Sequence, residues 1–331
     1  MSQPLTAYLI STAITTTKIS AVVAVVVIMV WGALILRRSR TKLTALLPGN
    51  VAKEQRMVLI ASAAIILLGY IGGRAAFERA AGLLGNNGLG PGVASIAPGP
   101  FYLGIVVAAV WVATRLYIPL GVVWDTLRIS RQTLRSIGAG VLGSALLMAS
   151  VYGVDFVRGW ITVKRVEPST RLILDLSAYA VLYAIIAFNE ELVFRGGLLE
   201  SLNRLGGPLC GMVGSSILFA MVHLADNPPW QRLFGLFLFG LALAELYLIA
   251  RSLWLPITVH WGVSVLSFAA VIGLPPIRIY LSGPVWLIGT SDQPDAGWVM
   301  IAALAVANVA LTWRLMTSHA HRPGMEFAPK S

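Results

Sequence analysis

The chain is poor in cysteine and in charge. One cysteine, Cys210, stands among 331 residues, so no intrachain disulfide can form, and we expect its thiol to be buried as a structural side chain. Only 12% of the residues are charged, whereas a soluble globular chain carries about 25%. This shortage of charge excludes an ordinary soluble protein.

Apolar residues take the place of the missing charges. They make up 57% of the chain, and the mean hydropathy is +0.80, as in a polytopic membrane protein. Runs of about 17–25 apolar residues bounded by charge predict an all-α transmembrane bundle of about eight or nine spans. The predicted spans are 19–36, 57–73, 101–124, 136–154, 172–189, 207–225, 230–250, 253–274 and 298–313.

The hydropathy pattern divides the chain into three parts. Residues 1–135 are expected to form N-terminal transmembrane helices interrupted by a Gly/Pro-rich loop at 80–100. Residues 136–275 are expected to form the helical core of the chain. Residues 276–331 are expected to hold a loop, the last transmembrane helix and a polar tail.

The net charge of +11 does not indicate a nucleic-acid partner. The basic residues lie mostly between apolar runs, where Lys and Arg orient spans and meet anionic lipid headgroups. The predicted partner of this charge is therefore the bilayer. The Lys/Arg bias of the loops favours an external N-terminus and a cytoplasmic C-terminus, although the basic loop 155–171 favours the opposite orientation.

Histidine is also scarce, and its placement is informative. Of four histidines, His319 and His321 lie in the polar tail, whereas His223 and His260 lie inside apolar runs. A single histidine in a span is most often a hydrogen-bonded packing residue. Two of them, together with a carboxylate pair at the end of another span, indicate a functional site, because ionisable side chains are costly within a membrane.

The carboxylate pair belongs to the stretch NEELVFR, residues 189–195. Glu191 and Arg195 have the i, i+4 spacing of a helical ion pair with the acid on the N-terminal side, which is the favourable order. Glu190 points about 100° away around the helix. We therefore predict that Arg195 neutralises Glu191 and that Glu190 remains unpaired.

Two further i, i+4 pairs lie on other predicted spans. Phe219 lies one turn before His223, and His260 lies one turn before Ser264, so each pair shares a helix face. Three helices thus offer a carboxylate from Glu190, two imidazoles and a hydroxyl.

This set of side chains is compatible with two chemistries. His223, His260 and Glu190 could bind a divalent metal such as zinc, which would activate a bound water. Alternatively, Glu190 acts as general base on water without a metal, while the histidines and Ser264 hold the water and the oxyanion. No HExxH helix is present, and the sequence does not choose between them. Both chemistries produce an activated water and therefore hydrolysis.

The motifs resemble those of the CPBP family of intramembrane proteases, which includes the CAAX-processing Rce1-type endopeptidases and the Abi or bacteriocin-immunity proteins. The family pattern is EExxxR, then FxxxH, then HxxxN, each on its own transmembrane helix. The corresponding stretches here are EELVFR (Glu190, Glu191, Arg195), FAMVH (Phe219, His223) and HWGVS (His260, Ser264). Ser264 departs from the family's usual asparagine and offers a shorter arm with one hydroxyl.

The resemblance implies an integral, multi-pass membrane endopeptidase. It implies Glu190 as catalytic carboxylate, His223 and His260 as the groups that orient water or stabilise the oxyanion, and Glu191, Arg195 and Phe219 as structural support. It further implies membrane-anchored or prenylated peptide substrates and a site open toward the cytoplasm. Two alternatives remain: a catalytically silent scaffold or immunity protein, because of Ser264, and a proton-coupled transporter that uses Glu190, Glu245 and the histidines.

Overall fold

Helices dominate the protein. The structure, a computed structural model, describes residues 53–86, 96–116, 122–226, 228–290, 293 and 296–320. Most of these residues are helical, which confirms the all-α prediction. Among the described residues, five helical segments are long and apolar enough to cross a membrane, and two shorter apolar helices accompany them. The predicted span 19–36 and the side chains of His319 and His321 lie outside the described part.

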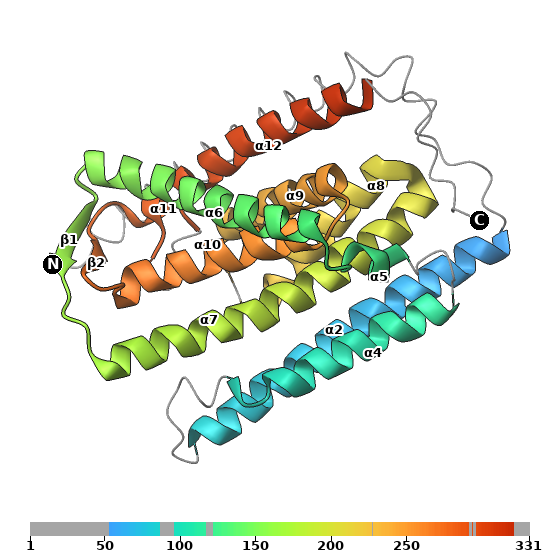
Figure 1. The fold of residues 1–331 in the computed structure, drawn as a ribbon, viewed down its shortest axis with the longest axis horizontal. Coiled ribbons are helices and arrows are strands. Elements are labelled where there is room, and N and C mark those ends of the chain that lie inside the picture. Colours follow the sequence, from blue (N-terminus) through green and yellow to red (C-terminus); the bar gives the residue numbers. More distant parts are fainter. Residues whose placement is uncertain are drawn as a thin grey trace, which may run out of the picture.

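The first two helices, α2 (Lys53–Asn86) and α4 (Gly99–Leu116), lie side by side at one edge of the molecule (Figure 1). A Cβ at Gly69 of α2 would lie 2.3 Å from Ala109 Cβ, so glycine permits this close approach. The prediction that the loop begins at residue 80 is wrong, because α2 continues to Asn86. The stretch from 80 to 84 is rich in Ala and Leu, which favour helix.

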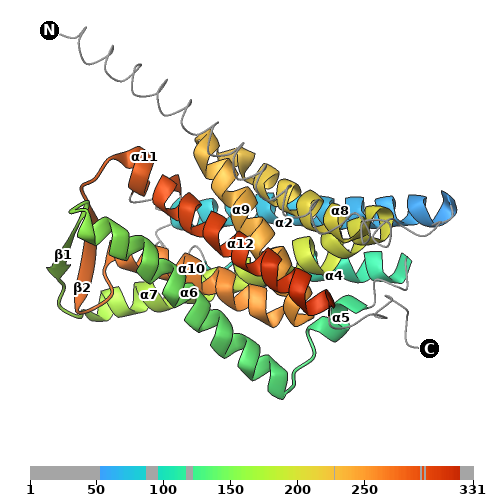
Figure 2. The same cartoon turned by 90° about the horizontal axis from the view of Figure 1, so that it is seen from above.

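A short helix, α5 (Val122–Thr126), precedes the central helices. These are α6 (Arg131–Val157), α9 (Trp230–Ala250), α10 (Trp254–Ile272) and α12 (Trp298–Ala320). The predicted spans at 136–154, 230–250, 253–274 and 298–313 each fall on one of them. In the two views of the fold, α10 runs beside α6, and α12 crosses next to α9 (Figures 1 and 2).

One long helical run holds the NEELVFR stretch. Helix α7 (Thr170–Glu191), capped by the Ser169 hydroxyl, continues directly into the π-helix η3 (Leu192–Leu199) and then into α8 (Glu200–Met221). The predicted end of a span at residue 189 is therefore wrong. The helix continues because its charged side chains find partners inside the bundle rather than at a membrane surface.

The chain reverses within α8, at Gly207. Its backbone has φ 84° and ψ 174°, a conformation that glycine adopts readily, and Pro208 follows. The second half of α8 then packs back on the first half and on the end of η3: a Cβ at Gly211 would lie 3.0 Å from Asn203 Cβ and 2.9 Å from the Leu199 carbonyl oxygen. The predicted span 207–225 corresponds to this returning half and the 3₁₀ turn η4 (Val222–Asp226) that follows it.

Two segments predicted as loops form a small antiparallel ribbon at one end of the bundle (Figure 1). Strand β1 (Ile161–Arg165) pairs with β2 (Ile277–Leu281), with Thr162 opposite Tyr280. A short helix, α11 (Val285–Ile288), follows β2. The pairing puts the loops after α6 and after α10 at the same end of the bundle, as the alternation of spans requires.

Buried apolar side chains form two clusters, one around η3, α2 and α8, the other between α6, α9, α10 and α12. Cys210 belongs to neither. It is exposed on α8, so the expectation of a buried thiol is wrong. An apolar side chain on the outer face of a membrane helix meets lipid, and hydropathy does not distinguish that position from a protein core.

Candidate active site

The residues from 189 to 201 are buried on every side of the helix. Most of them belong to η3, and a π-helix is rare and often found at functional sites. The segment carries Glu190, Glu191, Arg195 and Glu200, so four ionisable side chains lie inside the bundle. Each must find partners there, because an unpaired buried charge is costly.

Arg195 and Glu191 form the predicted ion pair. Arg195 Nη1 donates to Glu191 Oε1 at 2.8 Å, and both side chains have no exposed surface. Arg195 Nη2 donates to the Gly240 carbonyl of α9 at 2.8 Å, and the guanidinium lies 4.8 Å from the centre of the Phe219 ring. Arg195 thereby joins η3 to α8 and α9.

His260, from α10, contacts both carboxylates. Its Nδ1 lies 2.9 Å from Glu191 Oε1, and its Nε2 lies 3.7 Å from Glu190 Oε2. A carboxylate only accepts hydrogen bonds, so we assign a hydrogen to Nδ1, which donates to Glu191, while Nε2 faces Glu190. Glu191 therefore supports the site twice, by pairing with Arg195 and by fixing the His260 ring.

Glu190 is not unpaired, and the prediction to that effect is wrong. The Tyr70 hydroxyl of α2 donates to Glu190 Oε1 at 2.8 Å, and the tyrosine is fully buried. The sequence pattern could not reveal this partner, because 120 residues separate the two side chains. The only signal was a tyrosine within an otherwise apolar span. The second carboxylate oxygen, Oε2, is the one nearer His260.

His223 lies at the start of η4, directly after α8. Its Nδ1 donates to the Phe219 carbonyl oxygen at 2.8 Å, so Nε2 is the ring nitrogen that this bond does not use. The Phe219 ring is buried and lies 5.1 Å from the His223 ring and 5.9 Å from the His260 ring, measured between centroids. Phe219 therefore packs against both imidazoles.

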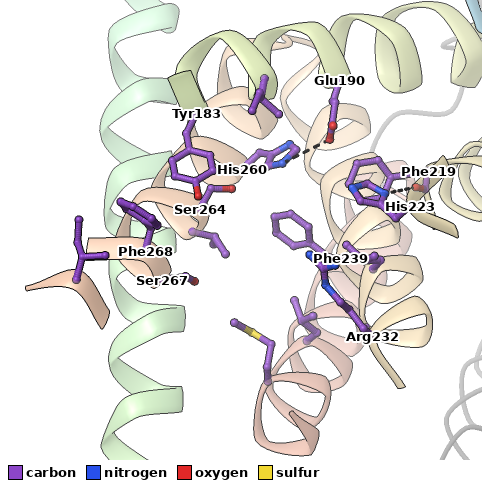
Figure 3. A pocket seen from close by; sticks show the side chains of 17 residues that line it. Tyr183, Glu190, Phe219, His223, Arg232, Phe239, His260, Ser264, Ser267 and Phe268 are labelled. Atoms are coloured by element: carbon purple, nitrogen blue, oxygen red, sulfur yellow. Dashed lines mark hydrogen bonds and ion pairs between the residues drawn. The ribbon is translucent and has the colours of Figure 1, made fainter. Parts of the chain in front are cut away.

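Ser264 lies one turn after His260 on α10, and both line a cavity of about 520 Å³ (Figure 3). The cavity opens between α7, α8, α9 and α10, and α12 contributes to its wall. Glu190 and His260 lie beside each other on its wall, and Tyr183 also faces it (Figure 3). The lining contains Glu190, His223, His260 and Ser264 together with Tyr183, Phe219, Arg232, Phe239, Ser267, Phe268 and apolar side chains.

The predicted metal ligands do not form a cluster. In the described part of the chain, no three His, Cys, Asp or Glu side chains are grouped as ligands for one ion. His223 and His260 each use one ring nitrogen on a protein acceptor, and Glu190 uses one oxygen on Tyr70. Metal-ligating histidines make the same kind of hydrogen bond with their second nitrogen, so these bonds do not exclude a metal. Because the described side chains are not grouped as ligands for one ion, we derive no step through a metal.

Sequence reasoning missed several side chains near the cavity. Tyr70 contacts Glu190, while Tyr183 and Arg232 line the cavity itself. Glu245 does not line it. That carboxylate is buried and accepts a hydrogen bond from Thr312 of α12, as expected of an interhelical polar group.

The helical bundle and its long apolar helices define an integral membrane protein whose candidate site lies inside the bundle. Residues 172–266 match the family model of the type II CAAX prenyl endopeptidases, Rce1-like. The CPBP resemblance is thus confirmed over residues 172–266, and the family that this part of the chain matches is one of endopeptidases. The match includes every motif residue from Glu190 to Ser264 and excludes α2. Comparisons with curated proteins and with solved structures give no match.

Proposed function

We propose that the protein is a multi-pass intramembrane endopeptidase that hydrolyses membrane-associated peptides with a water activated by Glu190. One observation carries the proposal: Glu190, His223, His260 and Ser264, which come from the three segments α7, η4 and α10, line one cavity. A carboxylate and two imidazoles that share a cavity inside an apolar bundle are the groups needed to bind and deprotonate water. The family match supports peptide hydrolysis as the reaction class.

In this mechanism a water binds between Glu190 Oε2 and the His260 ring. Both groups accept hydrogen bonds from it, so they hold the water with an oxygen lone pair directed at the substrate. As the water oxygen bonds to the peptide carbonyl carbon, its proton passes to Glu190. The carbonyl π electrons move to the oxygen and produce a tetrahedral oxyanion.

The oxyanion requires donors. The Ser264 hydroxyl can donate directly, and the His223 ring can donate from Nε2 when it carries a second proton. Collapse of the tetrahedral intermediate breaks the C–N bond, and the proton held by Glu190 passes to the leaving amine. Glu190 returns to its starting state, so the cycle consumes one water and releases a new carboxylate and a new amine.

The shape of the site favours substrates that arrive from the bilayer. Apolar side chains such as Ile186, Leu236 and Leu304 make up much of the cavity wall. A lipid-anchored or prenylated peptide would match that wall while its scissile bond reaches Glu190. The Lys/Arg bias of the loops supports a cytoplasmic opening of the site.

A matched pair of glutamate variants tests the proposal. Full-length protein in detergent or vesicles is incubated with prenylated and other membrane-anchored peptides, and cleavage is measured by mass spectrometry. We expect Glu190→Gln to abolish cleavage and Glu200→Gln to retain it. Glu200 is an apt control because it is equally buried, at 4% exposure, and also accepts a tyrosine hydrogen bond, but it does not line the cavity.

Each alternative has its own outcome. Equal cleavage by wild type and Glu190→Gln contradicts Glu190 as the base. A panel on which wild type cuts nothing supports the silent scaffold. Loss of cleavage on treatment with a chelator, with recovery on addition of zinc, contradicts the metal-free mechanism.

A further inference from the structure

Helix α2 contacts the candidate site at two points, although it lies outside the family match. Tyr70 and Arg74 are one helical turn apart and therefore share a face. Tyr70 donates to Glu190, and Arg74 Nη2 donates to Asp226 Oδ1 at 2.7 Å. Asp226 is the last residue of η4, the turn that carries His223. One face of α2 thus contacts both the Glu190 carboxylate and the turn that carries the His223 imidazole.

We propose that Tyr70 is a positioning residue for hydrolysis. Its hydroxyl fixes the Glu190 carboxylate so that Oε1 is occupied and Oε2 is left for the water. The inference rests on the proposed function and extends it to a helix that none of the sequence motifs includes.

Packing determines where the Tyr70 hydroxyl lies. The ring is fully buried, and its centre is 5.4 Å from the Phe194 ring of η3 in an edge-to-face arrangement. A second tyrosine, Tyr102 of α4, lies 6.2 Å away on the other helix of the pair. A donor held by rigid aromatic packing keeps its acceptor in one orientation, and small displacements of a catalytic group reduce turnover strongly.

The close approach of α2 to η3 keeps Tyr70 within reach of Glu190. Ile66 lies one turn before Tyr70 and occupies the space beside Gly197, where a Cβ would be 2.7 Å from Ile66 Cδ1. A larger residue at position 197 would force the Ile66 side chain to shift. The glycine in η3 therefore serves the contact between the N-terminal helix pair and the catalytic segment.

A buried glutamate needs hydrogen-bond donors in any protein, so the alternative is that the Tyr70–Glu190 hydrogen bond only stabilises the fold. The chain offers a matched comparison. Tyr247 of α9 donates to Glu200 at 2.8 Å, and both tyrosines are almost completely buried. The two hydrogen bonds have the same chemistry and length, but only Glu190 lines the cavity. A purely structural role predicts the same effect for both tyrosines.

The first test compares kinetics of the full-length Tyr70→Phe and Tyr247→Phe proteins. A hydrogen bond to a charged group contributes about 1.5–3 kcal/mol, so we expect kcat of Tyr70→Phe to fall about 10- to 100-fold with KM unchanged. Tyr247→Phe should retain the wild-type kcat. Equal kcat values for the two variants, or a change of Tyr70→Phe confined to KM, would overturn the inference.

A second test does not depend on activity. Melting temperatures in detergent are measured for Tyr70→Phe, Glu190→Gln and the double variant. We expect the effects to be non-additive, because the two side chains share one bond, and additive effects would overturn the inference. Non-additive melting temperatures without any Glu190-dependent cleavage would refute the proposed function and, with it, the role of Tyr70 in hydrolysis. The hydrogen bond between Tyr70 and Glu190 would still be supported.

The second contact gives an independent check. Arg74→Gln removes the charge that holds Asp226, whereas Arg74→Lys keeps it. We expect kcat to fall in Arg74→Gln and to recover in part in Arg74→Lys, because the pair positions the His223 turn. An unchanged kcat in Arg74→Gln would show that the Arg74–Asp226 pair does not position the His223 turn. The role of α2 would then be limited to Tyr70.

Discussion

Removal of the Arg195 guanidinium should destabilise the protein strongly. Arg195 makes two hydrogen bonds of 2.8 Å, to Glu191 and to the Gly240 carbonyl, and neither Arg195 nor Glu191 is exposed. Arg195→Met leaves the Glu191 carboxylate buried without its counter-ion. Breaking a buried pair in this way costs about 3–5 kcal/mol.

Related variants separate the contribution of the Arg195 charge from those of its forked contact and of the unpaired Glu191 carboxylate. Arg195→Lys keeps the charge, but one ammonium cannot reproduce the forked contact with Glu191 and Gly240, so we expect about half of the loss. The double variant Glu191→Gln/Arg195→Met should be more stable than Arg195→Met, because no charge is then left unpaired. Arg171→Met is the control: its pair with Asp175 has an N···O distance of 3.9 Å at the surface and should contribute about 0–1 kcal/mol.

The measurement is equilibrium unfolding in mixed micelles, followed by circular dichroism or tryptophan fluorescence. The reasoning is refuted if Arg195→Met is within about 1 kcal/mol of Arg171→Met. It is also refuted if the double variant is less stable than Arg195→Met, since the cost is assigned to the uncompensated carboxylate.

Three further outcomes are expected. Ser264→Ala should lower kcat and Ser264→Asn should retain activity, whereas full activity of Ser264→Ala would remove the hydroxyl from oxyanion binding. A chelator should leave Glu190-dependent cleavage unchanged, and loss restored by zinc would contradict this. In a Cys210→Ala background, cysteines at Thr162 and Tyr280 should cross-link on oxidation, because they face each other in the ribbon. Cysteines at Thr162 and Ile277 should not, and equal cross-linking of both pairs would contradict the register.

Much of the fold follows from hydropathy alone. The spans at 230–250, 253–274 and 298–313 appear as helices with nearly the predicted bounds, because long apolar runs in a membrane protein can satisfy their backbone only as helices. The prediction that a span ends at residue 189 is wrong because of the charged residues that also form the candidate site. Hydropathy counts Glu190, Glu191 and Arg195 as a boundary, but side-chain partners from other helices allow the segment to stay buried.

Pairing between distant segments could not be predicted. Strands β1 and β2 are more than a hundred residues apart, and each alone is a short alternating stretch in a predicted loop. The division of the chain at residues 135 and 275 remains a prediction. So does the cytoplasmic orientation of the site.

The sequence by itself determined the chemistry available to this protein. It identified a membrane bundle, the Glu191–Arg195 pair from its i, i+4 spacing, and the motif residues from Glu190 to Ser264. Only the tertiary structure decided how those groups are used: that His260 turns one nitrogen to Glu191, and that Glu190 is held by Tyr70. Local spacing specifies which side chains share a helix face. Which face meets which partner depends on how helices far apart in the chain pack together, and no local pattern records that.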